Sequence, residues 1–312
     1  MIPSFPPREG QVGFLYIPPF RVQGISVAGE ETVVQVPELD VCFDIGLCPR
    51  IALASPTVAL THAHMDHIGG LPYYFSQRVF QKLPPGRVVC HPRLAGPLEA
   101  MMRSWVDLEQ QRTPHEIVPI EPGAEIPIKN NMWLRAIEVS HTSPSLGYAV
   151  IERRSKLKPE FVDLPQERLR ELKSRGEEIT RTIEIPQIAV TGDTEPGPFL
   201  FRDEFASARI VVSECTFFEP EHRGRARVGK HMHVEDLVTL LNVWQAPNVV
   251  LTHVSRRTTM SYARERLDAL AGEHAGRLLF LMDHRANRAR HERQVAEDAA
   301  KHEPAPNASS DG

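Results

Sequence analysis

The sequence predicts a layered α/β fold, and two observations support this prediction. Short apolar runs of strand type alternate with helical segments from about residue 12 to residue 285, without an intervening linker. Four of these runs end just before residues of metal-ligand type, and layered α/β proteins collect their sites beyond the strand ends at one edge of a sheet. We therefore expect one domain over residues 1–285 and a polar C-terminal extension over residues 286–312 that begins as helix and ends disordered.

The first of the four runs, residues 56–60, leads into the segment Thr-His-Ala-His-Met-Asp-His-Ile-Gly-Gly at 61–70. Imidazole and carboxylate groups bind zinc and its first-row neighbours, and this segment holds three histidines and an aspartate within six positions. His62 and His64 are two residues apart, so on an extended segment they point to the same side. Asp66 and His67 are adjacent, so a turn has to aim both of them, and a second metal is indicated.

The other three runs end in the same way. Residues 133–140 precede His141, residues 188–192 precede Asp193, and residues 249–252 precede His253. Each of these residues alone would be weak support for a metal site, but all three share the position after a strand. The sequence therefore proposes seven ligands, which are His62, His64, Asp66, His67, His141, Asp193 and His253.

Composition indicates a water-soluble chain. Hydrophobic residues make up 41% of the 312 residues, enough for a sizeable core, and no apolar run approaches the ~20 residues of a membrane span. The N-terminus lacks the charged and apolar regions of a signal peptide. The four cysteines have no paired spacing and suit a reducing cytoplasm, and we expect Cys215 to be a small buried side chain.

Basic residues gather next to two of the motif histidines although the net charge at pH 7 is −4. Arg223, Arg225, Arg227 and Lys230 precede His231, and Arg256 and Arg257 follow His253. Because the placement of charge matters more than its sum, these arginines could bind phosphate groups in the bidentate way that guanidinium allows. The alternative for residues 223–230 is a mobile charged loop.

The order H-x-H-x-D-H-x-G-G, followed by His141, Asp193 and His253, resembles the metallo-β-lactamase superfamily. The resemblance implies an αββα four-layer sandwich over roughly residues 20–285. Finer motifs resemble tRNase Z, the family of endonucleases that remove 3′ trailers from precursor tRNA, in its short, plant-like form. These motifs are Asp44-Ile-Gly-Leu-Cys-Pro49, Ser145-Leu-Gly-Tyr148, Lys156-Leu-Lys-Pro-Glu-Phe161, Thr191-Gly-Asp-Thr194, Glu214-Cys-Thr-Phe217, His231-Met-His233 and Thr252-His-Val-Ser-Arg-Arg257.

The resemblance also implies a mechanism. Two zinc ions, about 3.5–4 Å apart, would lower the pKa of a shared water to about 7, and the hydroxide would attack phosphorus and leave a 3′-hydroxyl. One ion would be held by His62, His64 and His141, the other by Asp66, His67 and His253, with Asp193 bridging them. Mn²⁺ or Fe²⁺ could replace zinc. The catalytic residues implied are Asp66, His231 and Glu214, with His231 and Glu214 as the proton donor pair; His233 is a rival for the donor. The phosphate-binding residues implied are Arg227, Arg256 and Arg257.

Residues 152–182 are dense in charges of both signs, and Leu164, Leu169 and Leu172 fit one face of a helix over 164–175. Many tRNase Z enzymes carry a tRNA-binding arm in this part of the chain, often rich in Gly and Pro, a composition that this segment lacks. A solvated helix across the surface is the alternative.

The function expected from the resemblance is 3′ processing of precursor tRNA by a cytoplasmic homodimer, with no membrane partner. The first alternative keeps the same site but gives it another substrate, a small phosphodiester or another RNA, or more remotely a thioester or a lactam. The second alternative is a binding protein on a former enzyme fold, which the intact ligand set disfavours.

Overall fold

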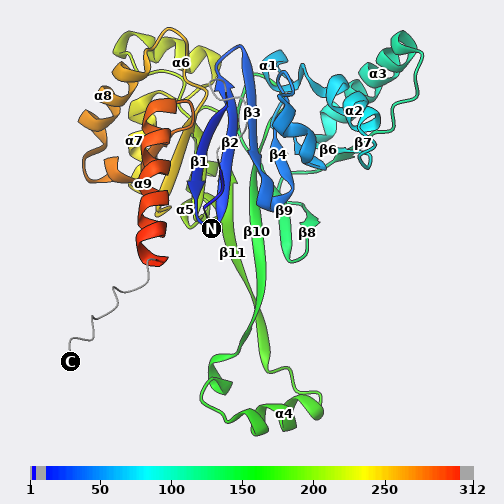
Figure 1. Cartoon of the computed structure of the whole chain (residues 1–312), viewed down its shortest axis with the longest axis vertical. Helices are drawn as coiled ribbons and strands as arrows, with labels where there is room; N and C mark the ends of the chain where they lie inside the picture. Colours follow the sequence, from blue (N-terminus) through cyan, green and yellow to red (C-terminus); the bar gives the residue numbers. More distant parts are fainter. Residues whose placement is uncertain (1, 5–11, 303–312) are drawn as a thin grey trace, which may run out of the picture.

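Two seven-stranded mixed sheets face each other at the centre of the molecule, and helices cover their outer faces (Figure 1). The computed structural model describes residues 2–4 and 12–302. The first sheet contains, in spatial order, β1 (Gly13–Ile17), β2 (Phe20–Val27), β3 (Glu31–Val36), β4 (Val41–Phe43), β5 (Thr57–Ala59), β6 (Arg87–Cys90) and β7 (Glu116–Pro119). The second contains β14 (Leu278–Phe280), β13 (Asn248–Thr252), β12 (Ile210–Glu214), β11 (Thr180–Val190), β10 (Leu146–Leu157), β9 (Met132–Glu138) and β8 (Glu125–Lys129).

The expected αββα sandwich is confirmed by how the helices pack. Apolar residues of α2 (Leu71–Phe80) and α3 (Pro92–Glu109) pack on the outer face of the first sheet. Those of α5 (Asp203–Ala206), α7 (Val234–Leu241) and α8 (Met260–Ala271) pack on the second. A third apolar cluster lies between the sheets. The short helices α1 (Met65–Ile68) and α6 (Arg223–Gly229) lie in connecting segments.

The central strands are buried on both faces, which explains why they appear in the sequence as continuous apolar runs. In β10, Tyr148 and Val150 belong to the cluster between the sheets, whereas Ala149 and Ile151 belong to the cluster under the outer helices. Successive side chains of a strand point to opposite faces, so one run of residues serves two layers of core.

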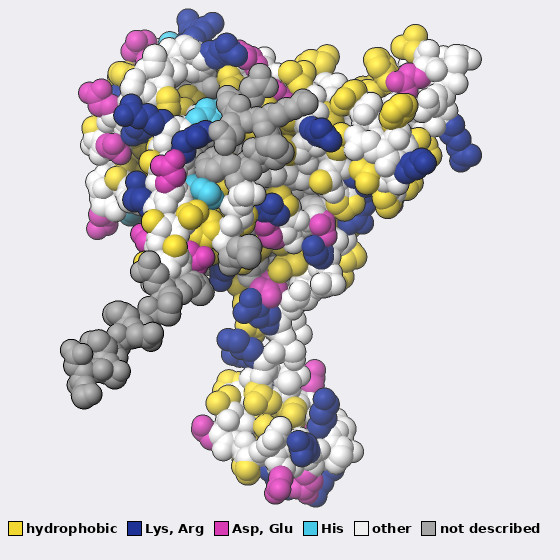
Figure 2. All heavy atoms as spheres, in the orientation of Figure 1, with side chains coloured by type: hydrophobic (Ala, Val, Ile, Leu, Met, Phe, Trp, Pro, Cys, Tyr) yellow, Lys and Arg dark blue, Asp and Glu magenta, His cyan; other side chains and the backbone are white. Residues whose placement is uncertain are grey.

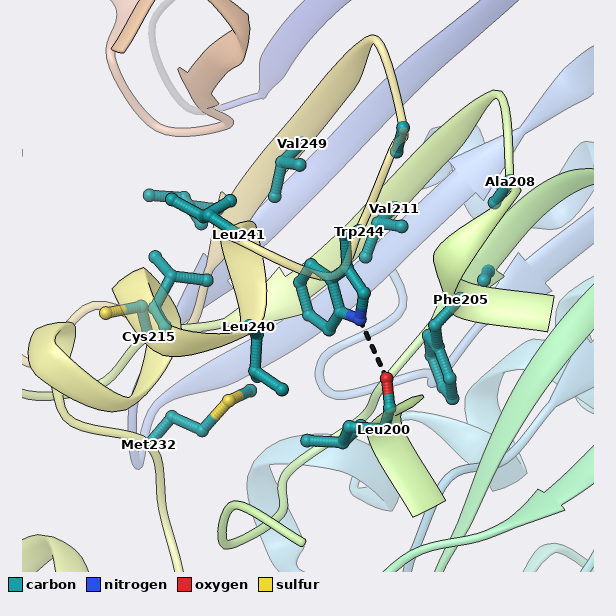
Figure 3. Packing of buried hydrophobic residues seen from close by; sticks show 14 of the residues in the cluster. Leu200, Phe205, Ala208, Val211, Cys215, Met232, Leu240, Leu241, Trp244 and Val249 are labelled. Carbon is teal, nitrogen blue, oxygen red and sulfur yellow. Dashed lines mark hydrogen bonds between the residues drawn. The ribbon is translucent and has the colours of Figure 1, made fainter. Parts of the chain in front are cut away.

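The outer core of the second sheet is centred on Trp244 (Figure 3). The indole stacks on Phe205 with ring centroids 6.1 Å apart, and its Nε1–H donates to the carbonyl of Leu200 at 2.8 Å. Burying an indole is favourable only when this donor finds an acceptor. Cys215 belongs to the same cluster and is fully buried, as the sequence predicts.

A long arm projects from the second sheet (Figure 1). It is built from the distal halves of β10 and β11 and ends in a 3₁₀ turn and α4 (Gln166–Ser174). The helix expected over 164–175 is therefore present, with Leu172 buried on its inner face. The alternative of a helix lying across the body is wrong, because two paired strands carry this helix away from it.

The C-terminal extension begins as a helix. α9 (His284–His302) crosses the boundary expected at residue 285 and packs on β1, where Gln294 donates to the carbonyl of Tyr16 at 3.1 Å. The expected disordered end, residues 303–312, lies outside the described residues, as does most of the N-terminal segment. Among the helices of the described residues, none has the length and apolarity to span a membrane. All four cysteines are free and buried.

Candidate metal centre

All seven side chains proposed as metal ligands lie together beyond the strand ends. His62 and His64 follow β5, His141 follows β9, Asp193 follows β11, and His253 follows β13. The ligand atoms form three groups, within each of which all atoms are 4.8 Å or less apart: His62, His64 and His141; His62, His67 and Asp193; and Asp66, His67 and His253. The polar residues that follow four strands from different parts of the chain therefore meet at one site.

The turn expected at Asp66 and His67 is the single helical turn α1, which starts after the extended residue His64. The chain can turn closely here because Gly70 has no side chain. A Cβ at this position would lie 2.5 Å from the backbone nitrogen of Cys48, so the loop after β4 packs directly on the motif.

Asp193 stands between two halves of the cluster, one formed by His62, His64 and His141 and the other by Asp66, His67 and His253. Its Oδ2 atom lies 3.1 Å from Nε2 of His253, 3.3 Å from Nε2 of His67 and 3.8 Å from Nε2 of His62. In the half with His64, the Nδ1 atom of that residue lies 3.2 Å from Nε2 of His141. One carboxylate thus faces ligands of both halves, which is the arrangement that a bridging residue requires.

The cluster fits divalent metal ions. Among the described residues, the Nε2 atoms of His62, His67 and His253 are buried without a hydrogen-bond partner. Buried polar atoms are costly when unpaired. Three of them converge on one carboxylate, and a metal would satisfy all three. In two of the proposed ligand histidines, the Nδ1 atom already has a partner. Nδ1 of His62 lies 3.0 Å from Oγ1 of Thr61, and Nδ1 of His141 donates to the carbonyl of Lys230 at 3.0 Å.

The protonation states of His62, His141 and Asp193 also suit metal binding. Burial holds the pKa of His62 well below its ordinary value, so the imidazole stays neutral, which is the form that binds a metal. Burial likewise lowers the pKa of His141. For Asp193, burial alone would raise the pKa, but the neighbouring His253 and His67 hold it well below its ordinary range.

Asp44 orients the cluster, and reasoning from the sequence gave it no role. It is buried, and its carboxylate accepts from the backbone N–H of Thr61 at 2.7 Å, from the Thr61 hydroxyl at 2.8 Å, and from Nδ1 of His67 at 2.8 Å. A carboxylate behind a ligand histidine fixes its ring and tautomer. Asp44 directly follows the apolar run of β4, so the strand-end pattern that identified the ligands could have found it too.

Replacing Asp44 by asparagine is expected to weaken metal binding about 10- to 100-fold without unfolding the protein. Asparagine has the same size and tolerates the left-handed backbone (φ 60°) found at this position. It lacks the negative charge that holds His67. Competition with a chromophoric chelator would measure the affinity, and an unchanged affinity would contradict the assigned role.

His231 lies beside the ligand cluster and is held by Glu214. Its Nδ1 atom lies 3.1 Å from Oε1 of Glu214 and 3.9 Å from Oδ2 of Asp193. Burial would lower the pKa of His231, but the Glu214 carboxylate raises it to about 9. Glu214 is itself fixed by the backbone N–H of Thr194 at 2.6 Å and by the hydroxyl of Thr216 at 2.6 Å.

Thr216 and His233 have structural positions that the sequence did not reveal. Oγ1 of Thr216 lies 2.9 Å from Nδ1 of His253, so it connects a ligand histidine to the His231–Glu214 pair. His233 is fully buried with both ring nitrogens engaged: Nδ1 accepts from the backbone N–H of Glu235 and caps α7, and Nε2 donates to the carbonyl of Glu219. This imidazole is part of a helix cap.

The proposed phosphate-binding arginines differ in their surroundings. Arg227 is exposed on α6, which replaces the mobile loop considered for residues 223–230. Arg257 is exposed in the turn after β13. In the part of the chain that the structure describes, neither has an ion-pair partner, whereas Arg256 pairs with Glu30. A phosphate would compete with a carboxylate for Arg256, whereas it would meet no such competitor among the described residues at Arg227 or Arg257.

The chain is similar to known proteins in sequence and in fold. Residues 49–254 match the model of the β-lactamase superfamily domain. The chain is 32% identical over 270 residues to a chloroplastic tRNase Z of Arabidopsis thaliana, covering 85% of this chain and 75% of the relative. It is 31% identical over 269 residues to a second tRNase Z of that plant, covering 84% and 95%. Among solved structures it resembles the short form of human tRNase Z, with a TM-score of 0.53 and 17% identity over 79% of this chain and 93% of that one, which is a likeness of fold.

Proposed function

Because the chain belongs to the tRNase Z family of the metallo-β-lactamase superfamily, a family of metal-dependent hydrolases, we propose that it is a zinc-dependent endoribonuclease that removes the 3′ trailer of precursor tRNA. The observation that carries this proposal is the His231–Glu214 pair beside the seven-ligand cluster. The ligands would hold a metal pair, and the histidine would supply the proton that a ribose 3′-oxygen needs in order to leave.

Five histidines and two aspartates would hold two zinc ions, one with His62, His64 and His141 and the other with Asp66, His67 and His253, and Asp193 would contact both. Imidazole-rich sets suit zinc, although they also accept manganese or iron. When bound, such a pair supplies a nucleophile at neutral pH by lowering the pKa of a water molecule. Asp66 is further held by the backbone N–H of Gly29 at 2.8 Å, so the hairpin between β2 and β3 closes this side of the site.

His231 acts as the general acid in this proposal. Glu214 keeps its ring oriented and protonated near neutral pH, so a proton is available at the leaving oxygen. Hydrolysis of a lactam or a thioester needs no phosphate clamp, whereas Arg227 and Arg257 stand exposed next to the elements that carry His231 and His253. These groups favour phosphodiesters over the remoter substrates.

The arm is the proposed contact with the body of the RNA. Figure 2 shows Lys and Arg side chains along the arm and at its tip, among Asp and Glu side chains. Lys156 and Arg181 are direct cross-strand neighbours, so two like charges share one face of the ribbon. Such a pair is unfavourable unless an anion compensates it, and a phosphate backbone would do so. The 12 residues of β10 span roughly 40 Å, so this contact lies far from the metal centre.

Shortening the arm tests the function directly. Replacing residues 156–181 with an Asn-Gly turn keeps the pairing of Ser155 with Thr182. Cleavage of a 3′-extended precursor tRNA should fall sharply, whereas hydrolysis of bis(p-nitrophenyl) phosphate, which reaches the metals directly, should persist. In the full-length enzyme, Lys156→Gln should flatten the salt dependence of RNA affinity by about 0.7–0.9 log units per log unit of salt. Glu160→Gln is the matched control and should leave it unchanged.

Equal losses on both substrates would point instead to a damaged fold. If the intact, metal-loaded enzyme failed to cleave precursor tRNA while hydrolysing small diesters briskly, the protein would be a phosphodiesterase of different specificity.

We also propose that the chain forms a homodimer, and an exposed apolar surface supports this. Exposed apolar side chains lie on or next to α1, α2 and α3: Leu47, Met65, Tyr73, Phe80, Trp105 and Leu108. Tyr73 and Phe80 are seven residues apart and so occupy one face of α2. A patch of this kind marks a protein interface. Light scattering should give a dimer for the native chain and a monomer for Phe80→Glu; a native monomer would contradict the proposal.

We propose that this enzyme acts in the cytoplasm. The four free, buried cysteines are compatible with a reducing compartment.

A further inference from the structure

The arm loses its lateral support where β10 and β11 leave the second sheet. The pairing of β9 with β10 ends at Met132 and Glu152, and β12 pairs with β11 only from Ile188 to Val190. Beyond these points the arm is a two-stranded ribbon, which is marginally stable by itself. The register of the ribbon also shifts between Val150 and Ile151, next to Pro186. The direction of the arm is therefore decided at its root.

A network of six charged side chains surrounds this root, and we call it the root cluster. Its members are Glu125 of β8, Arg135 of β9, Arg153 of β10, Glu184 of β11, and Arg202 and Glu204 at the start of α5. Three arginines balance three glutamates. The cluster thus joins both strands of the ribbon to two neighbouring strands and one helix of the body.

Arg135 is the centre of the root cluster. Its guanidinium donates to Glu125 at 2.9 Å and to Glu184 at 2.7 Å, and it lies 3.5 Å from Glu204. Arg153 donates to the other oxygen of Glu184 at 2.9 Å and also pairs with Glu125. Glu184 therefore forms ion pairs with Arg153 of the ribbon and with Arg135 of the body.

Arg153 and Glu184 are direct cross-strand neighbours, one residue beyond the last pair that β9 makes with β10. The guanidinium of Arg153 also lies over the ring of Trp133, 4.4 Å from its centroid. The backbone N–H of Arg153 also donates to the carbonyl of Asn131 at 2.9 Å. The first ribbon pair beyond the β9 ladder is thus tied back to the body.

Ion pairs hold this face of the root. A hollow of about 640 Å³ lies between the ribbon and α5, and its lining includes Arg135, Glu184 and Glu204. Arg135 is only 20% exposed, so its ion pairs are shielded more than those at an open surface. On the opposite face, Glu152 accepts from Arg154 and Gln187 at 2.7 Å each, so both faces of the ribbon are braced.

We propose that the root cluster fixes the direction of the arm relative to the metal centre, and that Arg135 and Glu184 are positioning residues for the cleavage of long RNA. The second half of this proposal rests on the proposed binding of precursor tRNA by the arm. The far end of β10 lies roughly 40 Å along the strand from Leu146. A small rotation at the root therefore becomes a larger displacement at the tip of the arm. Small diesters do not touch the arm and do not depend on its direction.

A spin-label distance measurement tests the clamp without RNA. Labels at Glu121→Cys on the body and Arg170→Cys on α4 join two exposed positions, and the four native cysteines are buried. The native root should give one narrow distance distribution. Glu125→Gln/Glu184→Gln keeps the side-chain sizes but removes both carboxylate partners of Arg153 and leaves Arg135 with Glu204 alone, so the distribution should broaden. Glu171→Gln/Glu178→Gln removes two ion-paired carboxylates near the arm's tip and should leave the distribution narrow.

The same variants separate positioning from folding. In Glu125→Gln/Glu184→Gln, kcat/KM for precursor tRNA should fall roughly 10- to 100-fold, mainly through KM, while hydrolysis of bis(p-nitrophenyl) phosphate stays at the native rate. An unchanged, narrow distribution would overturn the clamp. A broad distribution with unchanged tRNA cleavage would overturn the positioning role. If the arm-shortened enzyme cleaved precursor tRNA normally, the proposed RNA contact would fail, while the distance measurement would still decide the clamp.

Discussion

Replacing His231 by alanine is expected to lower turnover of precursor tRNA by about 10²- to 10⁴-fold while the protein keeps its metal. The imidazole lies beside Asp193 but is held by Glu214, and its raised pKa, about 9, keeps it protonated near neutral pH. The variant loses the proton donor for the leaving oxygen, and the ligand set stays complete. Single-turnover cleavage rates and metal analysis on the same preparation would measure both effects.

Glu214→Gln should cause a loss of similar size, because the glutamate acts through His231. The double variant should lose little more than either single one, since the two residues act as a unit. His233→Ala is the matched control. It should destabilise the start of α7 by about 0.5–2 kcal/mol but leave the chemical step near normal. A crippled His233→Ala enzyme with a nearly normal His231→Ala enzyme would show that the acid has been assigned to the wrong histidine.

Asp193→Ala is expected to remove metal and activity together, on precursor tRNA and on small diesters alike. Its carboxylate is within 3.8 Å of the ligand nitrogens of His62, His67 and His253, so its loss affects both halves of the cluster. The native protein should contain about two ions per chain, because seven ligands exceed the four that one tetrahedral zinc takes. Elemental analysis after zinc supplementation would measure the content.

The comparison with His231→Ala makes this result specific. His231→Ala should be inactive but metal-loaded, whereas Asp193→Ala should be inactive and depleted. A native content of one ion or none would contradict the binuclear site, and full metal retention in Asp193→Ala would contradict the bridging position.

The resemblance of its motifs to the metallo-β-lactamase superfamily implied the αββα sandwich, and the sequence by itself determined a layered α/β fold and the residues proposed for the ligand cluster. Both depend on local patterns: an apolar run of strand length, and the polar residue directly after it. His62, His141, Asp193 and His253 each occupy this position, and the topology of the sheets places such positions at one edge. The helix within the arm was predictable for the same reason, because the spacing of its leucines is a local signal.

Tertiary structure alone decided what depends on partners distant in the sequence. Asp44 is 23 residues from the histidine it orients, and Thr216 is 37 residues from His253. A local pattern can mark Asp44 as a residue after a strand, but it does not show which histidine Asp44 contacts, and it does not mark Thr216. His231 and His233 are the same residue type in one short motif. In the fold, His231 contacts Glu214, whereas His233 caps a helix. The arm's direction depends on Arg135, 49 residues from Glu184 in the chain. Such pairings form only when the sheets are assembled, because hydrogen bonds and ion pairs are set by distances in space and not by spacing along the sequence.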